Sequence, residues 1–476
     1  MGKSLMFNAR SRMPAPASEL FAWHTREGAL ERLMPPWETA ELLQRASDGI
    51  REGSRVVMRM KVGPVWQTWE ARHTKYIQDS LFQDEQVSGP FARWVHTHRI
   101  WPEPPSSSVL DDEVLYAPPM GVLGRAFGGG MIRRRLERVF AYRHAVTRED
   151  LRRHAAYAGQ GPLTVAMTGA TGLVGSALIP FLTTGGHRVR RLVRGRVDAA
   201  RGDVAWNPDK AEIDTAALEG VDAVVHLAGA NVGQRWTPEA RQLILRSRTE
   251  GTRVLCEALA RLQKKPKVLV CAAAIGFYGD RGDEVVTEVS PPGEGFLATV
   301  CREWEAASAP AEEAGIRVVH LRIGVVMDAR GGALAKLMTP TLLGGGGPVG
   351  GGRQWMSWVS MEDVLGLTQL ALFHSELRGP VNVVAPEAVR QGEFARVLGR
   401  VLSRPAVFPV PGAAVRALFG EMGRETLLSS THVRPEVAER LGYAFMHPRL
   451  EDALRFTLGH TTAGTAFMHA PSPVDS

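Results

Sequence analysis

The 476-residue chain has few cysteines and few lysines. Its three cysteines, Cys256, Cys271 and Cys301, include no C-x-x-C pair, which excludes a disulfide framework and a thiolate zinc site. Unpaired thiols are typical of a reducing compartment, so we expect a cytoplasmic protein. Only eight of the 57 basic residues are lysine. Heavy use of arginine, alanine, glycine and proline indicates a codon-composition effect rather than a nucleic-acid footprint.

Long apolar runs are also missing. The first residues, MGKSLMFNARSRMPAP, hold no apolar segment long enough for a signal peptide, and Met6 stands where a myristoylation signal requires serine or threonine. No stretch approaches the roughly 20 unbroken apolar residues that a membrane helix needs. We therefore expect no membrane span.

The densest basic segment contains Arg133, Arg134, Arg135 and Arg138 and continues to Arg143. A contact with polyphosphate or RNA is one interpretation of this segment. A solvated helix face is the favoured one, because charge runs on helices usually face water. We expect no nucleic-acid partner.

The pattern of the sequence divides the chain into three parts. Residues 1–155 combine short β-like runs near 54–73 with a C-terminal helix near 131–155. From 163 to 400, strand and helix patterns alternate, as in a parallel sheet built from β-α-β units. Residues 405–458 begin with prolines and continue as a helical pattern. The predicted fold class is α/β, with an N-terminal α+β domain and a small C-terminal helical cap.

A glycine-rich turn follows the apolar strand pattern at 163–168 (LTVAMT) and precedes a helical pattern that begins at Ser176. Gly169, Gly172 and Gly175 give the spacing G-x-x-G-x-x-G. In a dinucleotide-binding turn the first glycine lets the chain bend, the second admits the pyrophosphate, and the third packs helix against strand. The helix N-terminus stabilises the anion. A tight structural turn is the alternative interpretation, and the flanking strand and helix favour the dinucleotide. The intervening residues of the predicted site are Thr171, Leu173 and Val174.

The residue that follows the next strand pattern, at 188–193, indicates whether the site binds NAD or NADP. Arg194 stands there, 19 residues beyond Gly175. An NAD site usually has an acidic residue at this point for the ribose 2′-hydroxyl, whereas an arginine accommodates a 2′-phosphate. Arg194, with Arg191 or Arg196 as further candidates, therefore favours NADP(H).

Three further strand patterns follow, at 222–227, 267–272 and 318–323, which we take as the fourth, fifth and sixth strands of the sheet, with the third between 194 and 221. Six strands with this first turn predict a doubly wound Rossmann sheet that binds its ligand at the carboxyl ends of the strands. Gly229 lies just beyond one of these ends. Small residues there let a ribose or adenine approach the backbone, and ordinary helix–sheet packing is the alternative.

At this point the motifs resemble a known family. The turn and the segments 226–230 (HLAGA) and 274–279 (AIGFYG) resemble extended short-chain dehydrogenase/reductases of the epimerase/dehydratase type. Segments such as 246–248 (RSR) and 352–358 (GRQWMSW) sharpen the match to an atypical epimerase-like, cell-division-inhibitor-like subfamily with a short C-terminal domain of unknown function. The resemblance covers about 163–458. It implies that the NADP site also includes the following residues: Val193, Arg194, Leu227, Ala228 and Arg248.

The departure from that family concerns catalysis. Short-chain reductases typically use a serine after the fifth strand and Tyr-x-x-x-Lys on the next helix, where tyrosine moves a proton and lysine lowers its pKa. Here Cys271-Ala272-Ala273-Ala274 has no hydroxyl, and Phe296 and Val300 replace the tyrosine and lysine. The resembled subfamily generally lacks them too.

Tyr278 is the nearest remaining acid–base candidate, and an aromatic that packs the wall of the site is the favoured alternative. Cys301 is a candidate nucleophile that more often would be a small buried apolar residue. Arg353, with Trp355 and Trp358, is a candidate for holding an anionic or aromatic substrate, and the tryptophans are equally typical of a core.

Residues 1–155 resemble a helix-grip, START-like domain of the polyketide-cyclase/SRPBCC superfamily. The resemblance rests on segments such as 14–24 (PAPASELFAWH), 33–37 (LMPPW) and 94–98 (WVHTH). It implies an antiparallel sheet around a long helix, with a cavity for an apolar ligand. His96 and His98 would share one strand face with Trp94 and form a metal-ligand pair by type. No cysteine or obvious carboxylate lies nearby in sequence, so we expect hydrogen-bonded histidines and no metal.

Two functions fit the sequence. The first is an NADP(H)-dependent oxidoreductase or epimerase-like enzyme that acts on an unidentified small molecule. The second is a non-catalytic dinucleotide sensor or ligand carrier, which the missing serine, tyrosine and lysine favour. Family resemblance favours the enzyme. The substrate, the ligand of the N-terminal domain and the oligomeric state are open.

Overall fold

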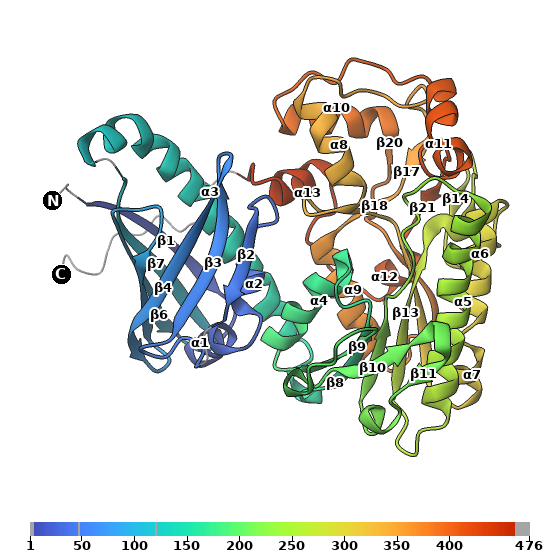
Figure 1. The fold of residues 1–476 in the computed structure, drawn as a ribbon, viewed down its shortest axis with the longest axis horizontal. Helices are drawn as coiled ribbons and strands as arrows, with labels where there is room; N and C mark the ends of the chain where they lie inside the picture. The colour runs from blue at the N-terminus through green and yellow to red at the C-terminus, as the bar shows by residue number, and fades with distance from the viewer. Residues whose placement is uncertain (1–3, 46–47, 120, 462–476) are drawn as a thin grey trace. The chain divides into compact units, whose positions relative to one another are not determined.

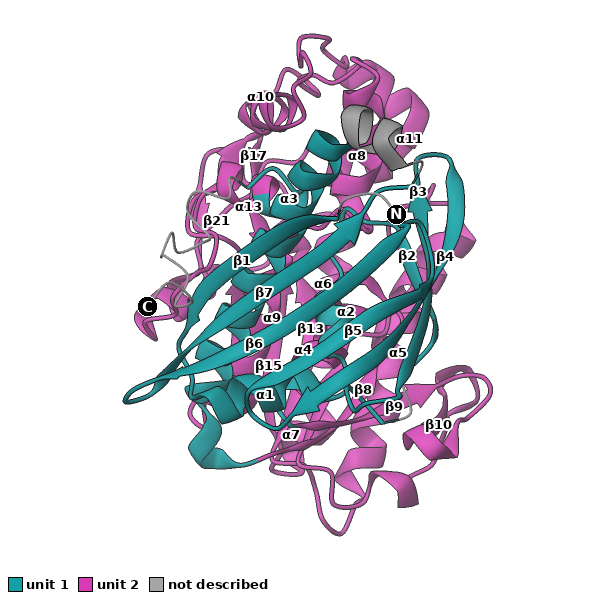
Figure 2. Ribbon diagram, turned by 90° about the vertical axis from the view of Figure 1, so that its left-hand side faces the viewer, with its two compact units in different colours: residues 1–161, 183–186, 456–476 teal, residues 162–182, 187–455 magenta. Residues whose placement is uncertain are grey.

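The computed structural model describes residues 4–45, 48–119 and 121–461. The chain forms two compact units, coloured separately in Figure 2. The first comprises residues 1–161, 183–186 and 456–476, and the second comprises 162–182 and 187–455. Residues 405–455 therefore belong to the same compact unit as the parallel sheet, rather than to a body of their own.

The first unit contains a seven-stranded antiparallel sheet in the order β1-β7-β6-β5-β4-β3-β2 (Figure 2). Its strands are β1 Leu5–Met13, β2 Ala40–Gln44, β3 Arg55–Val62, β4 Val65–Ile77, β5 Leu81–Ser88, β6 Arg93–Glu103 and β7 Ser107–Ala117. Strands β3 and β4 meet at a two-residue turn in which Gly63 has φ of 60°, as a mirror-type hairpin turn requires.

A long helix, α3 (Gly121–Ala155), packs along one face of this sheet (Figure 1). It begins ten residues before the expected start at 131. Two short helices, α1 (Ala17–Thr25) and α2 (Ala29–Arg32), close one end of the domain. Phe140 of α3 packs on Phe7 of β1, with ring centroids 5.2 Å apart. This is the helix-grip arrangement expected from the sequence.

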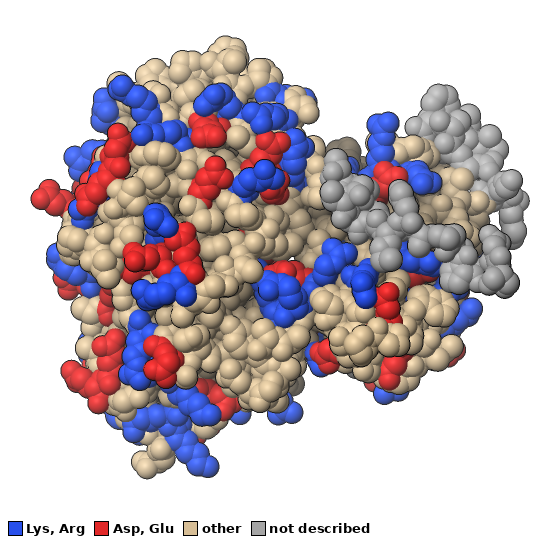
Figure 3. All heavy atoms as spheres, turned by 180° about the vertical axis from the view of Figure 1, so that it is seen from behind, with Lys and Arg blue, Asp and Glu red and all other residues tan. Residues whose placement is uncertain are grey.

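The arginines of α3 are largely engaged within the unit. Arg133 donates to Glu137 one turn later at 3.1 Å, and Arg135 donates to Glu38 at 3.0 Å. Arg143 donates to the carbonyl of Leu33 at 3.1 Å. Where Figure 3 colours the surface by charge, basic and acidic side chains are interspersed. The absence of a nucleic-acid partner stays a prediction, and these pairings favour it.

The second unit contains an eight-stranded sheet in the order β11-β10-β9-β8-β12-β13-β15-β19. Its strands are β8 Thr164–Thr168, β9 Arg188–Val193, β10 Val204–Asn207, β11 Glu212–Ile213, β12 Ala223–His226, β13 Val268–Ala274, β15 Arg317–Ile323 and β19 Gly379–Val383. All neighbours are parallel except β10 and β11. The prediction of six strands missed the edge strands β11 and β19, while the doubly wound order is confirmed.

Helices cover both faces of this sheet, so its central strands are buried throughout. Figure 1 shows α5 (Pro238–Ala260), α6 (Phe296–Ala306) and α7 (Ala309–Glu313) on one side. On the other side lie α4 (Leu173–Thr184) and α9 (Met361–Phe373). Helix α4 begins three residues before the expected Ser176, inside the glycine motif.

The C-terminal part of the second unit adds helices and three two-stranded sheets. The helices are α8 Gly332–Leu342, α10 Gln391–Val401, α11 Gly412–Thr426, α12 Glu436–Arg440 and α13 Leu450–Thr457. The strand pairs are β14 Val285–Val286 with β21 His432–Val433, β16 Val325–Met327 with β18 Trp358–Ser360, and β17 Trp355–Met356 with β20 Val389–Arg390. The expected C-terminal cap is mostly helical, as predicted.

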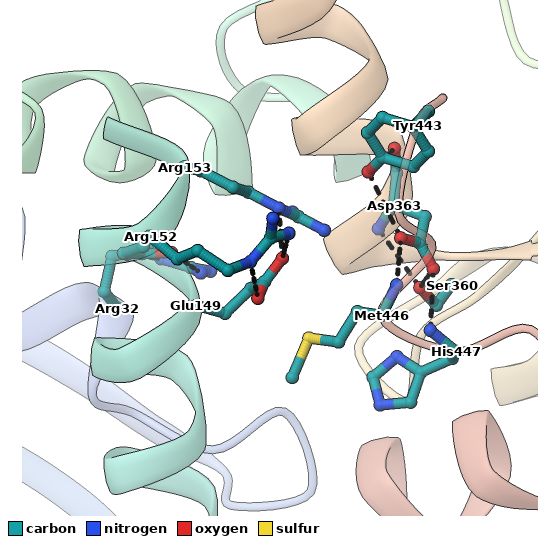
Figure 4. Close-up of polar contacts among 10 residues, drawn as sticks. Arg32, Glu149, Arg152, Arg153, Ser360, Asp363, Tyr443, Met446 and His447 are labelled. Atoms are coloured by element: carbon teal, nitrogen blue, oxygen red, sulfur yellow. Dashed lines mark hydrogen bonds and ion pairs between the residues drawn. The ribbon is translucent and has the colours of Figure 1, made fainter. Parts of the chain in front are cut away.

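Asp363, at the start of α9, fastens this C-terminal segment to the Rossmann core. Its buried carboxylate accepts hydrogen bonds from the Ser360 hydroxyl at 2.7 Å and from the backbone N–H groups of Met446 at 2.8 Å and His447 at 3.1 Å (Figure 4). The Tyr443 hydroxyl donates to the same carboxylate at 3.2 Å. A buried carboxylate satisfied in this way holds the loop before α13 in place.

In the part of the chain that the structure describes, no helix combines the length and the apolar character needed to cross a bilayer.

Candidate functional site

The glycine turn joins β8 to α4 at the centre of the parallel sheet, where the strand order reverses between β8 and β12. Gly169 has φ of 69°, and a Cβ atom there would lie 2.7 Å from the backbone carbon of Leu227. A Cβ atom at Gly175 would lie 2.3 Å from the carbonyl oxygen of Gly169. Neither position can accept a larger residue without backbone movement. The roles expected of the first and third glycines therefore fit the structure.

The outer side of the turn is open. Gly172 donates its backbone N–H to Gly169 at 3.0 Å, which closes the turn, and both Thr171 and Gly172 are exposed. Leu173 and Val174 are half-buried in the first turn of α4. The first N–H groups of a helix lack partners within it, so this end of α4 presents donors and partial positive charge to an anion.

Thr168, the last residue of β8, connects the turn to the neighbouring strand. Its hydroxyl oxygen accepts hydrogen bonds from the N–H groups of Leu227 at 3.1 Å and Ala228 at 3.2 Å. The hydroxyl proton is therefore directed to Nδ1 of His226, 2.7 Å away. Nε2 of His226 then carries the proton donated to Thr252 at 3.0 Å. This chain of bonds fixes Leu227 and Ala228 beside the turn, and sequence patterns alone did not reveal it.

Burial and, to a smaller extent, the nearby charge of Arg248 together lower the pKa of His226 from 6.5 to about 4. Because the unfolded chain protonates this histidine near pH 6.5, acidification between 6.5 and 4 favours unfolding. We expect the free energy of unfolding of the wild type to exceed that of His226→Asn by about 2 kcal/mol less at pH 5 than at pH 7. Urea denaturation at each pH measures this difference in unfolding free energy. A difference that does not change with pH would show that His226 is not held neutral.

Arg248, on α5, lies under the loop that follows β12. Its guanidinium donates to the carbonyl of Ala230 at 3.0 Å, and a Cβ atom at Gly229 would lie 3.0 Å from its Cζ. The guanidinium also lies 4.8 Å from the centre of the Trp304 ring. Burial lowers the pKa of Arg248. The guanidinium of Arg248 therefore lies so close to the backbone at Gly229 that a larger residue there would crowd it.

Val193 ends β9, the strand beside β8, and Arg194 follows it. The side chain of Arg194 is exposed, and no hydrogen bond or ion pair joins it to a residue that the structure describes. Arg191 is different, because Asp203 binds it through two contacts of 2.8 and 2.7 Å. Arg191 is therefore committed to its own carboxylate, which leaves Arg194 and the exposed Arg196 as candidates for a phosphate.

The side of the site beyond β13 lacks proton-transferring groups at the usual positions. Cys271 is buried, as are Phe296 and Val300 on α6. Burial raises the pKa of Cys301 to about 12, so its thiol stays protonated and inert at neutral pH. This supports the interpretation of Cys301 as a small apolar core residue.

Tyr278 is fully buried, and its hydroxyl is engaged on both sides. It donates to Oδ1 of Asn382 at 2.7 Å and accepts from Nη1 of Arg322 at 2.9 Å. Arg322 is in turn held by the carboxylate of Glu305 through two bonds of 2.8 Å. Burial raises the pKa of Tyr278, against the opposing effect of Arg322. The surroundings of Tyr278 are those of a packing residue, and catalysis by Tyr278 stays a prediction.

The tryptophans of the 352–358 segment have separate roles. Trp358 is fully buried and donates to the carbonyl of Glu387 at 2.8 Å, which makes it a core residue. Trp355 is half-buried, stacks on His432 at 4.1 Å and lies under Arg390 at 4.0 Å. Arg353 is exposed. The structure does not place Arg353 and both tryptophans together on one open surface.

Glu425, from the C-terminal segment, was not anticipated by sequence reasoning. Its carboxylate accepts the N–H groups of Phe296 at 3.0 Å and Leu297 at 2.9 Å, so it caps the N-terminus of α6. This is the helix on which short-chain reductases usually carry tyrosine and lysine. No local signal could have found the cap, because 129 residues separate Glu425 from Phe296.

Comparisons with known proteins agree with this geometry. Residues 165–384 match the NAD dependent epimerase/dehydratase family, residues 410–457 a domain of unknown function (DUF1731), and residues 13–140 the polyketide cyclase/dehydrase and lipid transport family. An epimerase family protein of Mycobacterium bovis is 41% identical over 293 residues, which are 61% of this chain and 96% of the relative.

Two solved structures are similar. A Corynebacterium glutamicum protein described as a nucleoside-diphosphate sugar epimerase has a TM-score of 0.79 and 30% identity, over 96% of this chain and 91% of that chain. Human epimerase family protein SDR39U1, solved with NADPH, has a TM-score of 0.58 and 31% identity, over 63% of this chain and 100% of that chain. The glycine turn, the doubly wound sheet and these relatives together show that the chain belongs to the NAD-dependent epimerase/dehydratase family, fused to an N-terminal domain of the polyketide cyclase type.

Proposed function

We propose that this protein binds NADP(H) at the glycine turn and acts as an oxidoreductase of the epimerase type on a small molecule. The observation that carries the proposal is the turn itself. Gly169 and Gly175 have no room for a Cβ atom, while Thr171 and Gly172 are exposed at the start of α4. The human relative solved with NADPH supports the choice of coenzyme.

The residues present fit the coenzyme. The turn and the N-terminus of α4 would hold the pyrophosphate, and Arg194 would hold the 2′-phosphate. Val193, Leu227, Ala228 and Gly229 would line the site, with Arg248 holding the loop after β12 through Ala230. When bound, the nicotinamide supplies hydride transfer.

Arg194→Asp tests the coenzyme selectivity. The exposed guanidinium has no described partner to lose, so the substitution changes the charge at the site and little else. We expect NADPH binding to weaken by more than tenfold, about 1.4 kcal/mol, while NADH binding is spared. Isothermal titration calorimetry with both coenzymes measures the effect.

Arg253→Asp on α5 is the matched control, because among the described residues its exposed guanidinium pairs with Glu257 alone, one turn later at 2.6 Å. It makes the same change of charge without touching the glycine turn. Equal weakening of NADPH and NADH by Arg194→Asp would show that Arg194 does not contact the 2′-phosphate.

A non-catalytic role as dinucleotide sensor or ligand carrier is the second candidate. The buried, doubly bonded hydroxyl of Tyr278 and the apolar residues at Phe296 and Val300 favour it. In that role, bound NADP(H) would stabilise one conformation for a partner to recognise.

Tyr278→Phe discriminates between the two candidates. The purified protein is given NADPH with a panel of carbonyl compounds and nucleotide sugars, and coenzyme oxidation is followed. If Tyr278 donates the proton, turnover disappears while NADPH affinity is kept. The loss of the hydrogen bonds to Asn382 and from Arg322 should also destabilise the fold by about 1–3 kcal/mol. Unchanged turnover would remove Tyr278 as the proton donor, and no turnover in the wild type favours the sensor.

The proposed partners are small molecules: a substrate near the nicotinamide and an apolar ligand in the N-terminal domain. The family match of residues 13–140 to polyketide cyclases and lipid transport proteins supports the second. All three cysteines are free thiols, which supports a cytoplasmic location.

A further inference from the structure

The N-terminal domain contains a buried group of histidines and aspartates that the proposed function does not use. Its members lie on the sheet face that packs against α3. They are Asp84 on β5, His96 and His98 on β6, Asp112 on β7 and His144 on α3. All but Asp84 are nine-tenths buried, and the side chain of Asp84 is 17% exposed.

Strand register brings these residues together. Asp84 pairs with His96 across β5 and β6, and His98 pairs with Asp112 across β6 and β7. Successive residues alternate between the two faces of a strand, so His96 and His98 share one face. Their rings lie 3.9 Å apart, centroid to centroid.

Each imidazole turns one nitrogen to Asp84 and the other to Asp112. Nδ1 of His96 lies 3.5 Å from Oδ2 of Asp84, and Nε2 of His98 lies 3.9 Å from the same oxygen. On their other sides, Nε2 of His96 lies 3.1 Å and Nδ1 of His98 lies 2.5 Å from Oδ1 of Asp112.

We infer that Asp84, His96 and His98 form a binding site for a divalent transition-metal ion of the zinc class. Their ligand atoms all lie within 4.8 Å of one another. Two ligands at 2.0–2.1 Å from a tetrahedral ion are about 3.3 Å apart, close to the 3.5 and 3.9 Å observed here. Two imidazoles and one carboxylate form a donor set that zinc, iron and cobalt accept.

Asp112 supplies the outer support that such sites require. Metal-bound histidines usually direct their second ring nitrogen to a carboxylate, which fixes the ring and raises its basicity. Asp112 faces that nitrogen on both His96 and His98. Its other oxygen lies 2.7 Å from Nε2 of His144, and Nδ1 of His144 lies 2.9 Å from the Ser11 hydroxyl. With its second nitrogen facing Asp112, each ring faces Asp84 with the other nitrogen, Nδ1 in His96 and Nε2 in His98.

The test uses the full-length protein after dialysis against a chelator. Titration with Co²⁺ should give the visible absorption of a tetrahedral site with one ion per chain, and Zn²⁺ should displace it. X-ray absorption of the wild-type Co²⁺ complex should show two imidazole nitrogens and oxygen, without sulfur. A wild-type protein that is folded and takes up no Co²⁺ at micromolar concentration would overturn the inference.

Variants of similar size locate the ion. Asp84→Asn and His98→Gln should each weaken Co²⁺ binding by more than 100-fold, and Asp112→Asn by 10- to 100-fold. His24→Gln is the matched control. His24 is buried in the same core, with its ring 5.8 Å from His98, but its Nδ1 is bonded to the carbonyl of Leu20 at 2.8 Å. Circular dichroism confirms folding of each variant. Cobalt binding that survives both ligand substitutions would place the ion elsewhere and refute the site.

Discussion

Gly175→Ala is expected to weaken NADPH binding by at least 100-fold, about 2.7 kcal/mol. In an ordinary helix this substitution stabilises by up to about 1 kcal/mol. At Gly175 the new Cβ would lie 2.3 Å from the carbonyl oxygen of Gly169 and 3.0 Å from Cα of Ala170. Both are backbone atoms, so the helix must move away from the strand. The pyrophosphate then loses the N–H groups at the start of α4.

Gly251→Ala is the control for this experiment. Gly251 lies inside α5 of the same unit, and its Cβ would make an ordinary contact with Pro208 at 3.8 Å. We expect it to leave NADPH affinity unchanged in the calorimeter. If Gly175→Ala bound NADPH within threefold of the wild type, the glycine turn would not be the coenzyme site.

Arg322→Met is expected to destabilise the second unit by about 3–5 kcal/mol, because it leaves a largely buried carboxylate without its partner. Arg322 is 4% exposed and holds Glu305 through two bonds of 2.8 Å. It also donates to the hydroxyl of Tyr278 and lies 3.5 Å from the centre of the Phe277 ring. Thermal denaturation should show the unfolding midpoint falling by roughly 10 °C.

Two further variants test whether the loss of stability comes from the unpaired carboxylate of Glu305. Arg302→Met removes an exposed arginine of α6 that contacts Glu303 at 3.2 Å, and it should change stability by less than about 0.5 kcal/mol. Adding Glu305→Leu to Arg322→Met removes the unpaired carboxylate and should recover much of the loss. If Arg322→Met alone were as stable as the wild type, the ion pair of Arg322 and Glu305 would not support the surroundings of Tyr278.

The features predicted correctly from the sequence are those formed by residues that are adjacent along the chain. The turn at Gly169, Gly172 and Gly175 is contiguous, and its strand and helix lie directly before and after it. The doubly wound order follows from the same alternation. The edge strands β11 and β19 were missed because β11 has only two residues and β19 begins with Gly379 and Pro380, which are not typical of a strand.

The features that sequence reasoning missed depend on long-range register. His96 and His98 were recognised as a potential ligand pair, but their carboxylates were not, because Asp84 and Asp112 arrive from the two flanking strands. In the same way, Asp203 binds Arg191, which the sequence offered as a further phosphate ligand beside Arg194. The sequence shows which side chains could bind a metal or a phosphate. Which other side chains lie beside them depends on the tertiary structure.

The position of Glu425 has a consequence for the order in which this protein matures. A ribosome releases the glycine turn more than 200 residues before Glu425, the residue that caps α6. The glycine turn is therefore synthesised well before the carboxylate that caps α6. Until Glu425 emerges, the first N–H groups of α6 have no capping carboxylate, so we expect the second unit to complete its folding only after residue 425 has left the ribosome.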